Sequence, residues 1–336
     1  MNKSQKTVFV TGATGLLGSN TVLALLSKQY HVKALARSEE KARKVLRDDS
    51  QLQVVVGDLM EPETWLSHLE ECDVVIHAAA YFREYFGRGE HDHSLTTLNV
   101  DFPVRLIKEG IARGVSRFVM ISSTGVISGR SDGLPSSEGD PANVQIPGNG
   151  YQESKKMMEV ALSTLDLHGA ELVIVRPGWM WGPGDYAPTA TGQIVLDMLG
   201  KKTFQFVGGT PFGIVDARDV AFGLAQIVAM ETPKRLYHLA GYNITALEAI
   251  QTIAKQIGTV KVQSIPYGAA IFLSGLLEFF TRMTGARNPL PREGIEVISK
   301  GVQVSSELAK SQLGVHFRPF TETAKDTVSF VRSNLV

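Results

Sequence analysis

A glycine-rich segment near the N-terminus, Thr11-Gly12-Ala13-Thr14-Gly15-Leu16-Leu17-Gly18, limits the fold more than any other feature of the chain. It follows the apolar run at 8–10 and leads into a helix-like run at 16–27. Glycines in such a turn reach positive φ and let the backbone approach a ligand closely. The following helix offers free N–H groups and the positive end of its dipole to a phosphate. We therefore expect a pyrophosphate-binding turn, although the spacing is Gly-x-x-Gly-x-x-Gly rather than the usual Gly-x-Gly-x-x-Gly.

Composition excludes several classes of function. The 336 residues carry 34 basic and 34 acidic side chains, so no basic surface for nucleic acid is indicated. A single cysteine, Cys72, excludes an intramolecular disulfide and a multi-cysteine metal site. The first six residues run directly into the first expected strand and leave no room for a secretory signal, so a reducing, cytoplasmic setting is expected.

Two further segments are interpreted as structural. The apolar stretch at 267–280 is shorter than the roughly 20 residues that span a bilayer and contains Glu278, so we expect a buried or pocket-capping helix. Peripheral membrane contact stays open as an alternative. The run His91-Asp92-His93 lacks the further ligands that would complete a metal shell, and no metal is expected.

Short apolar runs alternate with amphipathic segments through the first half of the chain. Strands are expected at 7–10, 31–36, 53–56, 74–77, 118–122 and 172–175, and helices at 16–27, 39–47, 62–69, 95–113 and 151–167. Near-continuous apolar strands separated by helices indicate an α/β fold with a doubly wound parallel sheet. Ligands of such sheets bind at the carboxyl ends of the strands.

The rhythm changes after Arg176, where Gly, Pro and Trp become frequent and several helix-like segments follow. We expect a cofactor-binding domain of residues 1–176 plus about 215–240, and a smaller, mostly helical substrate-binding lobe of 177–214 plus 241–336. The loop at 128–150 is rich in Ser, Gly and Pro, and is expected to be a mobile edge of the active site.

Tyr151 and Lys155 stand four residues apart at the start of an expected helix, which places both on one face. A phenol with a reference pKa near 10 is a poor acid–base group at neutral pH. A neighbouring ammonium favours the phenolate and lowers that pKa. The pair therefore predicts a general acid–base unit that moves a proton on or off a carbonyl oxygen.

The chain resembles the extended short-chain dehydrogenase/reductase family over nearly its whole length, most of all the dihydroflavonol-reductase and 3β-hydroxysteroid-dehydrogenase branch. The matching elements, in order, are the glycine turn, Gly57-Asp58-Leu59, His77-Ala78-Ala79-Ala80, Asn99-Val100-Asp101, Ile121-Ser122-Ser123, Tyr151 with Lys155, Arg176-Pro177-Gly178, and Val215-Asp216-Ala217-Arg218-Asp219-Val220. The resemblance implies a nicotinamide-binding Rossmann fold and an oxidoreductase activity.

The resemblance also implies catalytic roles. Tyr151 is then the proton donor or acceptor, and Lys155 tunes it and holds the nicotinamide ribose. Ser123 bonds the substrate oxygen, with Ser122 and Thr124 open as alternatives, and Asn99 has a structural and proton-relay role. Asp219 is interpreted as structural rather than catalytic.

The remaining implied site residues surround the cofactor. Asp58 accepts a bond from the adenine amino group while Leu59 packs on the ring, and Pro177 shapes the loop at the carboxamide. The full expected set for the cofactor, beyond Tyr151 and Lys155, is Gly12, Thr14, Gly15, Leu16, Leu17, Gly18, Arg37, Ser38, Asp58, Leu59, Ala78, Ala79, Ala80 and Pro177.

The end of the second expected strand bears on the choice of cofactor. An NAD enzyme usually has an acid there for the ribose 2′-hydroxyl, whereas this chain has Arg37 followed by Ser38. An arginine fork suits a 2′-phosphate, so NADP(H) is expected over NAD(H), with Lys41 as a further contact.

Aromatic residues follow the fourth strand and the sixth. We expect Tyr81, Phe82, Tyr85, Thr124, Trp179 and Trp181 to contact the substrate. Aromatic walls with few polar groups suit an apolar ligand. The leading interpretation is an NADPH-dependent reductase, or the reverse dehydrogenase, for a hydrophobic ketone or aldehyde, acting as a monomer or homodimer. The alternative is a sugar-nucleotide epimerase with a tightly bound nucleotide.

Overall fold

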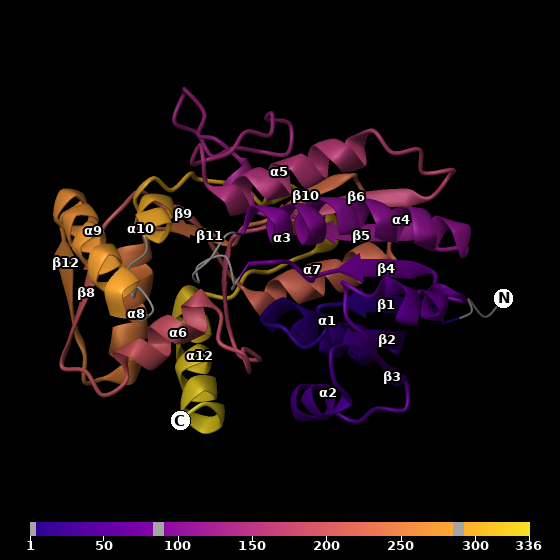
Figure 1. Cartoon of the computed structure of the whole chain (residues 1–336), viewed down its shortest axis with the longest axis horizontal. Helices are drawn as coiled ribbons and strands as arrows, with labels where there is room; N and C mark the ends of the chain where they lie inside the picture. Colours follow the sequence, from indigo (N-terminus) through magenta and orange to yellow (C-terminus); the bar gives the residue numbers. More distant parts are fainter. Residues whose placement is uncertain (1–4, 83–90, 285–291) are drawn as a thin grey trace.

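The computed structural model describes residues 5–82, 91–284 and 292–336. Its main feature is a seven-stranded, all-parallel sheet with the strand order β10-β6-β5-β4-β1-β2-β3 (Figure 1). The strands are β1 (Thr7–Thr11), β2 (His31–Ala36), β3 (Leu52–Val56), β4 (Val74–His77), β5 (Arg117–Ile121), β6 (Glu171–Pro177) and β10 (Leu236–Leu239). The order reverses between β1 and β4, and this switch point is where such sheets bind ligands.

Alternate residues of each inner strand pack on opposite faces of the sheet, as the two-residue period of a strand requires. In β1, for example, Val8 and Val10 join one buried cluster and Phe9 joins the other. The first cluster includes residues of α1 (Leu16–Ser27), α2 (Glu39–Val45), α7 (Ala217–Ala229) and α11 (Glu307–Leu313). The second includes residues of α4 (Phe102–Ala112) and α5 (Gly150–Ser163). The predicted doubly wound parallel sheet, covered on both faces, is confirmed.

Two expected helices are different in the structure. Residues 62–69 form two 3₁₀ turns, Pro62–Thr64 and Leu66–Leu69, in place of one α-helix. The expected helix at 95–113 consists of α3 (Asp92–Thr96), a π-helical turn at Thr97–Asp101, and α4. The π turn places Asn99 in the site described below, and such turns are frequent at functional sites.

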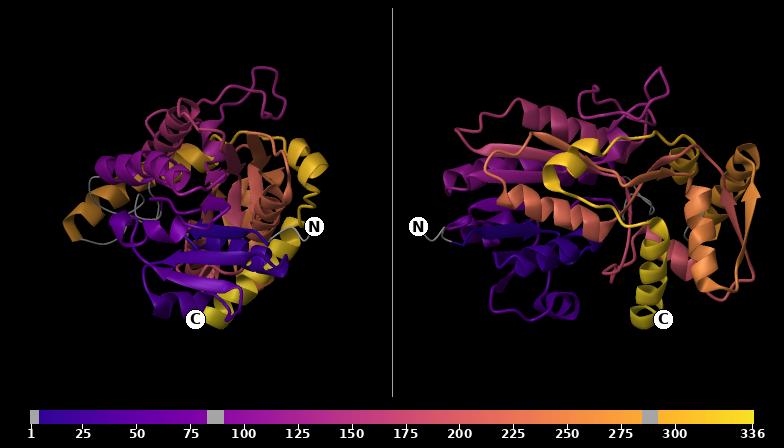
Figure 2. Two further views of the ribbon diagram at one scale, coloured as in Figure 1. Left: turned by 90° about the vertical axis from the view of Figure 1, so that its right-hand side faces the viewer. Right: turned by 180° about the vertical axis from the view of Figure 1, so that it is seen from behind.

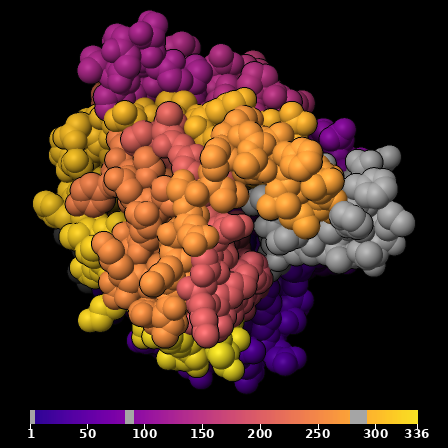
Figure 3. All heavy atoms as spheres, turned by 90° about the vertical axis from the view of Figure 1, so that its left-hand side faces the viewer, coloured from indigo at the N-terminus to yellow at the C-terminus, as the bar shows by residue number. Residues whose placement is uncertain are grey.

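Beyond the end of β6 the chain builds a second region, at the opposite end of the molecule from the N-terminus (Figure 2). It contains a three-stranded sheet, β11-β9-β7, and a two-stranded sheet, β12-β8. Its elements are β7 (Trp179–Trp181), α6 (Ala190–Met198), β8 (Thr203–Val207), β9 (Phe212–Asp216), β11 (Tyr242–Ile244), α8 (Ala246–Ile257), β12 (Lys261–Ile265), α9 (Tyr267–Thr284), α10 (Arg292–Ser299) and α12 (Phe320–Asn334). Figure 3 shows the molecule from the side of this second region, with its orange and coral segments side by side.

The C-terminal part of the chain returns to the large sheet before its last helix. Ala309 and Leu313 of α11 are fully packed in the cluster that also holds α1 and α7. The division into a cofactor-binding domain and a substrate-binding lobe stays a proposal. Helix α11 lies on the large sheet, although the sequence analysis assigned its range, 241–336, to the lobe.

The loop at 128–149 is fastened to the chain at several points, which differs from the mobile edge expected from its composition. Its backbone forms bridges between Ile127 and Ala142 and between Ser136 and Val304. Ser136 is fully buried, and its hydroxyl donates to the carbonyl of Ser128 at 3.2 Å. The loop is therefore held on the strand-like segment at 302–306.

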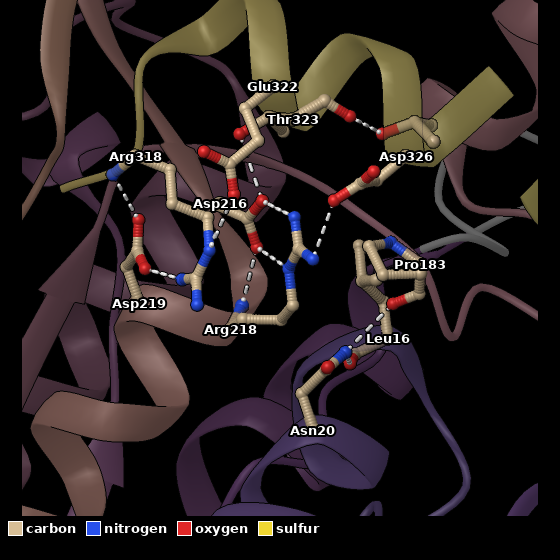
Figure 4. A network of polar contacts seen from close by, with 11 residues as sticks. Leu16, Asn20, Pro183, Asp216, Arg218, Asp219, Arg318, Glu322, Thr323 and Asp326 are labelled. Atoms are coloured by element: carbon tan, nitrogen blue, oxygen red, sulfur yellow. Dashed lines mark hydrogen bonds and ion pairs between the residues drawn. The ribbon is translucent and has the colours of Figure 1, made fainter. Parts of the chain in front are cut away.

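A polar network fastens α12 to the beginning of α7 (Figure 4). The fully buried Asp216 carboxylate caps α7 by accepting from the backbone N–H of Arg218 at 2.8 Å, and it also accepts from the Thr323 hydroxyl of α12 at 2.9 Å. The guanidinium of Arg218 bridges Asp216 and Asp326, each at 2.7 Å. Asp219 binds Arg318, which gives it the structural role that was predicted.

Candidate active site

The glycine turn joins β1 to α1 and packs against the end of β4. Gly12 has a φ of +66°, and a Cβ there would lie 2.7 Å from the backbone nitrogen of Ala79. A Cβ on Gly18 would overlap the carbonyl oxygen of Gly12. Only glycine therefore allows these three backbone segments to come together.

The start of α1 is open to an anion. Its N-cap is Gly15, which makes no side-chain cap, and its first turn holds no acidic residue. No side chain among the described residues caps the backbone N–H groups of this first turn, and the dipole favours a negative charge. The turn thus fits the pyrophosphate of a dinucleotide, with Gly12, Gly15 and Gly18 leaving the backbone accessible.

A buried histidine ties the end of β4 to this turn. His77 Nδ1 lies 2.7 Å from the Thr11 hydroxyl oxygen, which also accepts from the backbone N–H of Ala79 at 3.4 Å. Burial, aided by the positive charge of Lys155, lowers the pKa of His77 to about 3, so this imidazole is neutral. His77 is part of the motif His77-Ala78-Ala79-Ala80, but its contact with Thr11 arises only because β1 and β4 pair in the sheet, so the motif alone does not predict it. This contact holds Ala78 and Ala79 beside the glycine turn.

The end of β2 exposes the residues expected to select the cofactor. The side chain of Arg37 is exposed and makes no ion pair with the described residues. Ser38 is the N-cap of α2, and its hydroxyl oxygen accepts from the backbone N–H of Lys41 at 3.2 Å. Arg37 is therefore available to an external anion, while the Ser38 hydroxyl keeps its own hydrogen for a further bond.

Asp58 and Leu59 lie after β3, next to the carboxyl end of the sheet. One carboxylate oxygen of Asp58 accepts from the backbone N–H of Met60 at 2.8 Å, and the side chain stays half-buried. Leu59 packs at the edge of the cluster that contains Trp65. Asp58 thus organises its own turn, and the adenine contact stays a prediction.

Tyr151 and Lys155 occupy the first turns of α5, as predicted. The helix begins at Gly150 because the Asn149 side chain caps it, accepting from the backbone N–H of Gln152 at 3.0 Å. Lys155 is 2% exposed, and its Nζ donates to the carbonyl oxygen of Ile121 at 2.8 Å. That carbonyl is at the end of β5, so the lysine lies at the carboxyl edge of the sheet.

The phenol of Tyr151 lies between Lys155 and an aromatic neighbour. Lys155 Nζ is 6.0 Å from the centre of the Tyr151 ring, and the Phe82 ring lies 4.7 Å away on a tilted plane. Burial raises the pKa of Tyr151 above its usual value of 10.0, and it lowers that of Lys155 to about 8. The free site therefore holds a protonated phenol beside an ammonium that titrates close to neutral pH.

Asn99 connects this helix to the segment that carries Phe82. Its amide oxygen accepts from the backbone N–H of Tyr81 at 2.8 Å, and its amide nitrogen donates to the Tyr81 carbonyl at 3.0 Å and to Ser154 Oγ at 3.1 Å. Ser154 in turn donates to the carbonyl of Tyr151 at 2.8 Å. Asn99 thus has a structural role, and its part in a proton relay stays a prediction. Tyr85 lies outside the described residues.

The three candidate hydroxyls after β5 differ in position. The Ser122 hydroxyl is buried with no partner among the described residues. Ser123 is half-buried, and its hydroxyl oxygen accepts from the backbone N–H of Gly125 at 3.0 Å, which caps the 3₁₀ turn Thr124–Val126. Thr124 is also half-buried. Ser123 therefore has a fixed hydroxyl with its hydrogen still available to a substrate oxygen.

The tryptophans after β6 have unequal surroundings. Pro177 ends β6, paired with Leu239 of β10. Trp181 is fully buried in a hydrophobic cluster, with its ring 4.9 Å from Trp179 and 5.8 Å from Phe320. Its position is that of a core residue, which differs from the expected place in a pocket wall. Trp179 is only half-buried and keeps accessible surface.

The sequence interpretation missed a charged pair behind the lysine. Glu159, four residues after Lys155, is buried and binds Arg176 of β6. The four-residue spacing on one helix face was a signal for the position of Glu159. Its partner comes from a strand and could not be read locally.

Comparisons with known proteins agree with this geometry. Relatives include a 4-hydroxy-2-methyl-3-oxo-4-farnesyl-3,4-dihydroquinoline-1-oxide ketoreductase of Stigmatella aurantiaca, 28% identical over 91% of this chain and 90% of the relative. Sterol demethylase protein B of Methylococcus capsulatus is 28% identical over 92% and 93% of the two chains. The crystal structure of gox2253 superposes with a TM-score of 0.78 at 25% identity, covering 98% of this chain and 99% of that one.

The likeness extends to proteins of the predicted branch and to nucleotide complexes. Dihydroflavonol-reductase-like and 3β-hydroxysteroid dehydrogenase proteins are among the relatives, as the sequence motifs predict. Structures that share the fold at 18% and 21% identity, with TM-scores of 0.75 and 0.73, were solved with NAD⁺ and with NADPH. Within the described residues, every helix is too short or too polar to cross a membrane.

The model of the family described as "NAD dependent epimerase/dehydratase family" matches residues 8–245. The family is described as NAD-dependent, and the relatives include a ketoreductase and a sterol-4-alpha-carboxylate 3-dehydrogenase, so this chain is a reductase, dehydrogenase or epimerase that acts on hydroxyl or carbonyl groups. The glycine turn, the parallel sheet and the match over most of the chain lead to one conclusion: the protein belongs to the NAD-dependent epimerase/dehydratase family.

Proposed function

We propose that this enzyme is an NADPH-dependent reductase, or the reverse dehydrogenase, that interconverts a hydrophobic ketone or aldehyde and its alcohol. The observation that carries the proposal is the Tyr151–Lys155 pair, which lies at the carboxyl edge of the sheet with Phe82 against the phenol. An apolar ring beside the proton-donating group favours an apolar substituent on the reacting carbonyl.

In this proposal the chain's own residues handle the proton while the bound nicotinamide supplies or accepts the hydride. Tyr151 carries its proton at neutral pH, since burial raises its pKa further above 10.0, and its hydroxyl is the proposed proton donor to the substrate oxygen. Ser123 donates a second hydrogen bond to that oxygen and orients it. Lys155, as an ammonium, favours the phenolate left after transfer.

The substrate contacts are proposed from position and chemistry. Tyr81, Phe82 and Thr124 are half-buried and adjoin the catalytic group in the chain or in space, and Trp179 adds a half-buried ring beyond β6. The relatives named for a farnesylated quinoline and for sterols support a large apolar substrate.

Consumption of NADPH with a panel of aryl, alkyl and steroid ketones and aldehydes tests the proposal. Turnover with the apolar members is the expected result. Retention of nucleotide through purification, with no net consumption on the panel but turnover of a sugar nucleotide, would instead establish the epimerase alternative.

Arg37→Ala is expected to weaken NADPH binding about 10- to 100-fold, since hydrogen bonds to a charged group contribute about 1.5–3 kcal/mol. Binding of NADH, which lacks the 2′-phosphate, should not change. The control is Arg47→Ala, an exposed arginine past the end of α2. Equal NADPH affinity in Arg37→Ala and wild type, measured by fluorescence titration, would overturn the NADP(H) assignment.

A further inference from the structure

A buried ion pair lies directly behind the catalytic lysine. Glu159 Oε1 accepts from Arg176 Nε at 2.9 Å, and Glu159 Oε2 accepts from Arg176 Nη2 at 2.5 Å. The two side chains are only 9% and 4% exposed. Both carboxylate oxygens and two of the guanidinium nitrogens are therefore used in a planar, two-bond pair.

The Arg176 end of the pair is anchored in the sheet, beside the neighbouring strand β10. Arg176 lies beside His238 of β10 in the strand register, and Arg176 Nη1 is 3.4 Å from His238 Nε2. The backbone N–H of His238 donates to the Glu138 carboxylate at 2.8 Å. Burial, together with the charge of Arg176, lowers the pKa of His238 to about 3, so His238 is neutral. Arg176 is thus held in place with Glu159 as its directly bonded counter-ion.

Glu159 faces Lys155 on the buried side of α5, one helical turn away. The charged and titratable groups that interact with Lys155, among the described residues, are Tyr151 and Glu159 of α5 and His77 of β4, and Arg176 of β6 is bound to Glu159. His77 is neutral, and Arg176 carries the same sign as the lysine. Glu159 is the anion in this group, and it opposes the effect of burial on Lys155.

We propose that Glu159 is a positioning residue for this enzyme: fixed by Arg176, its carboxylate keeps Lys155 in the ammonium form on the Ile121 carbonyl. The inference rests on the proposed function, in which the ammonium contacts the cofactor and tunes Tyr151. A buried ion pair adds little stability over well-packed apolar residues, so stability alone does not account for one at this place.

The test compares Glu159→Gln, the double variant Glu159→Gln/Arg176→Gln and the control Glu153→Gln. The control makes the same charge change on the same helix at a half-buried residue that forms no ion pair in the described structure. The dissociation constant of NADPH is measured from pH 7 to 10 by nucleotide fluorescence, and circular dichroism checks folding. This binding readout needs no substrate.

The sign follows from the charge of Lys155. In wild type the ammonium is lost as the pH rises through about 8, and NADPH affinity falls with it. Without the Glu159 carboxylate the pKa of Lys155 is lower, so affinity is lost about one pH unit earlier in the double variant. The single variant leaves the charge of Arg176 uncompensated, so the pH at which its NADPH affinity is half lost should fall further than in the double variant. If the single variant does not fold, the double variant alone tests the role of Glu159. Glu153→Gln should follow wild type.

Each outcome bears on the inference or on the proposed function separately. If the double variant lost NADPH affinity at the same pH as wild type, Glu159 would only neutralise Arg176, and the inference would be overturned. A wild-type affinity that is independent of pH would do the same. Binding of NADH in place of NADPH would refute the cofactor preference. The same pH titration with NADH would then test the role of Glu159. A shifted midpoint with no turnover on the carbonyl panel would refute the proposed reaction and support the inference.

Discussion

Tyr151→Phe is expected to lower kcat for carbonyl reduction by about 10²- to 10⁴-fold, the usual contribution of a general acid. The change removes one oxygen and leaves the ring against Phe82, at 4.7 Å in the wild-type structure. Most of the cofactor affinity should be kept, because Lys155 and the glycine turn are untouched and only one contact, that of the Tyr151 hydroxyl, is lost. Steady-state kinetics with the best ketone of the panel measure the loss.

A hydroxyl deletion elsewhere provides the matched control. Tyr242 is 43% exposed, and its hydroxyl donates to the carbonyl of Phe317 at 3.0 Å, outside the site. Tyr242→Phe should therefore keep wild-type kcat. If Tyr151→Phe retained more than about a tenth of the activity, the proton would have to come from another group. Ser123 would then be the first hydroxyl to replace.

The parts of the fold that were predicted correctly depend on local signals. The bounds of α1, β2 and β4 match the expected ones, because each is a compact run with the right period between turn residues. The glycine turn could be recognised for the same reason: its strand, its turn and its helix are contiguous. Tyr151 and Lys155 share a helix, so their common face followed from spacing alone.

What could not be predicted depends on segments that meet only in the folded chain. Asn99 and Tyr81 are 18 residues apart, and their double hydrogen bond requires a π turn that composition does not indicate. Arg176 reaches Glu159 from a strand, and Trp181 is covered by Phe320 from near the C-terminus. The polar composition of 128–149 indicated mobility, while its pairing with Val304 fastens it. Long-range partners thus decided each of these positions.

Asp216→Ala is expected to lower the free energy of unfolding by about 3 kcal/mol. The Asp216 side chain is fully buried and caps α7, and loss of an N-cap costs about 1 kcal/mol. The same carboxylate accepts from Arg218 Nε at 3.0 Å and from the Thr323 hydroxyl at 2.9 Å. Removing it leaves these donors without their buried acceptor, and the charged bond among them accounts for most of the remainder.

Asp326→Ala separates the contribution of the buried carboxylate from that of the ion pair itself. Asp326 binds the same guanidinium of Arg218 at 2.7 Å, but its side chain is 34% exposed, so its loss should cost less than about 1 kcal/mol. Urea denaturation followed by circular dichroism gives both values. Because α12 carries Ala324 and Val328 into the core of the second region, detaching it exposes apolar surface as well. Equal, small losses in the two variants would show that packing of α12, rather than the Asp216 network, fastens this helix to the sheet.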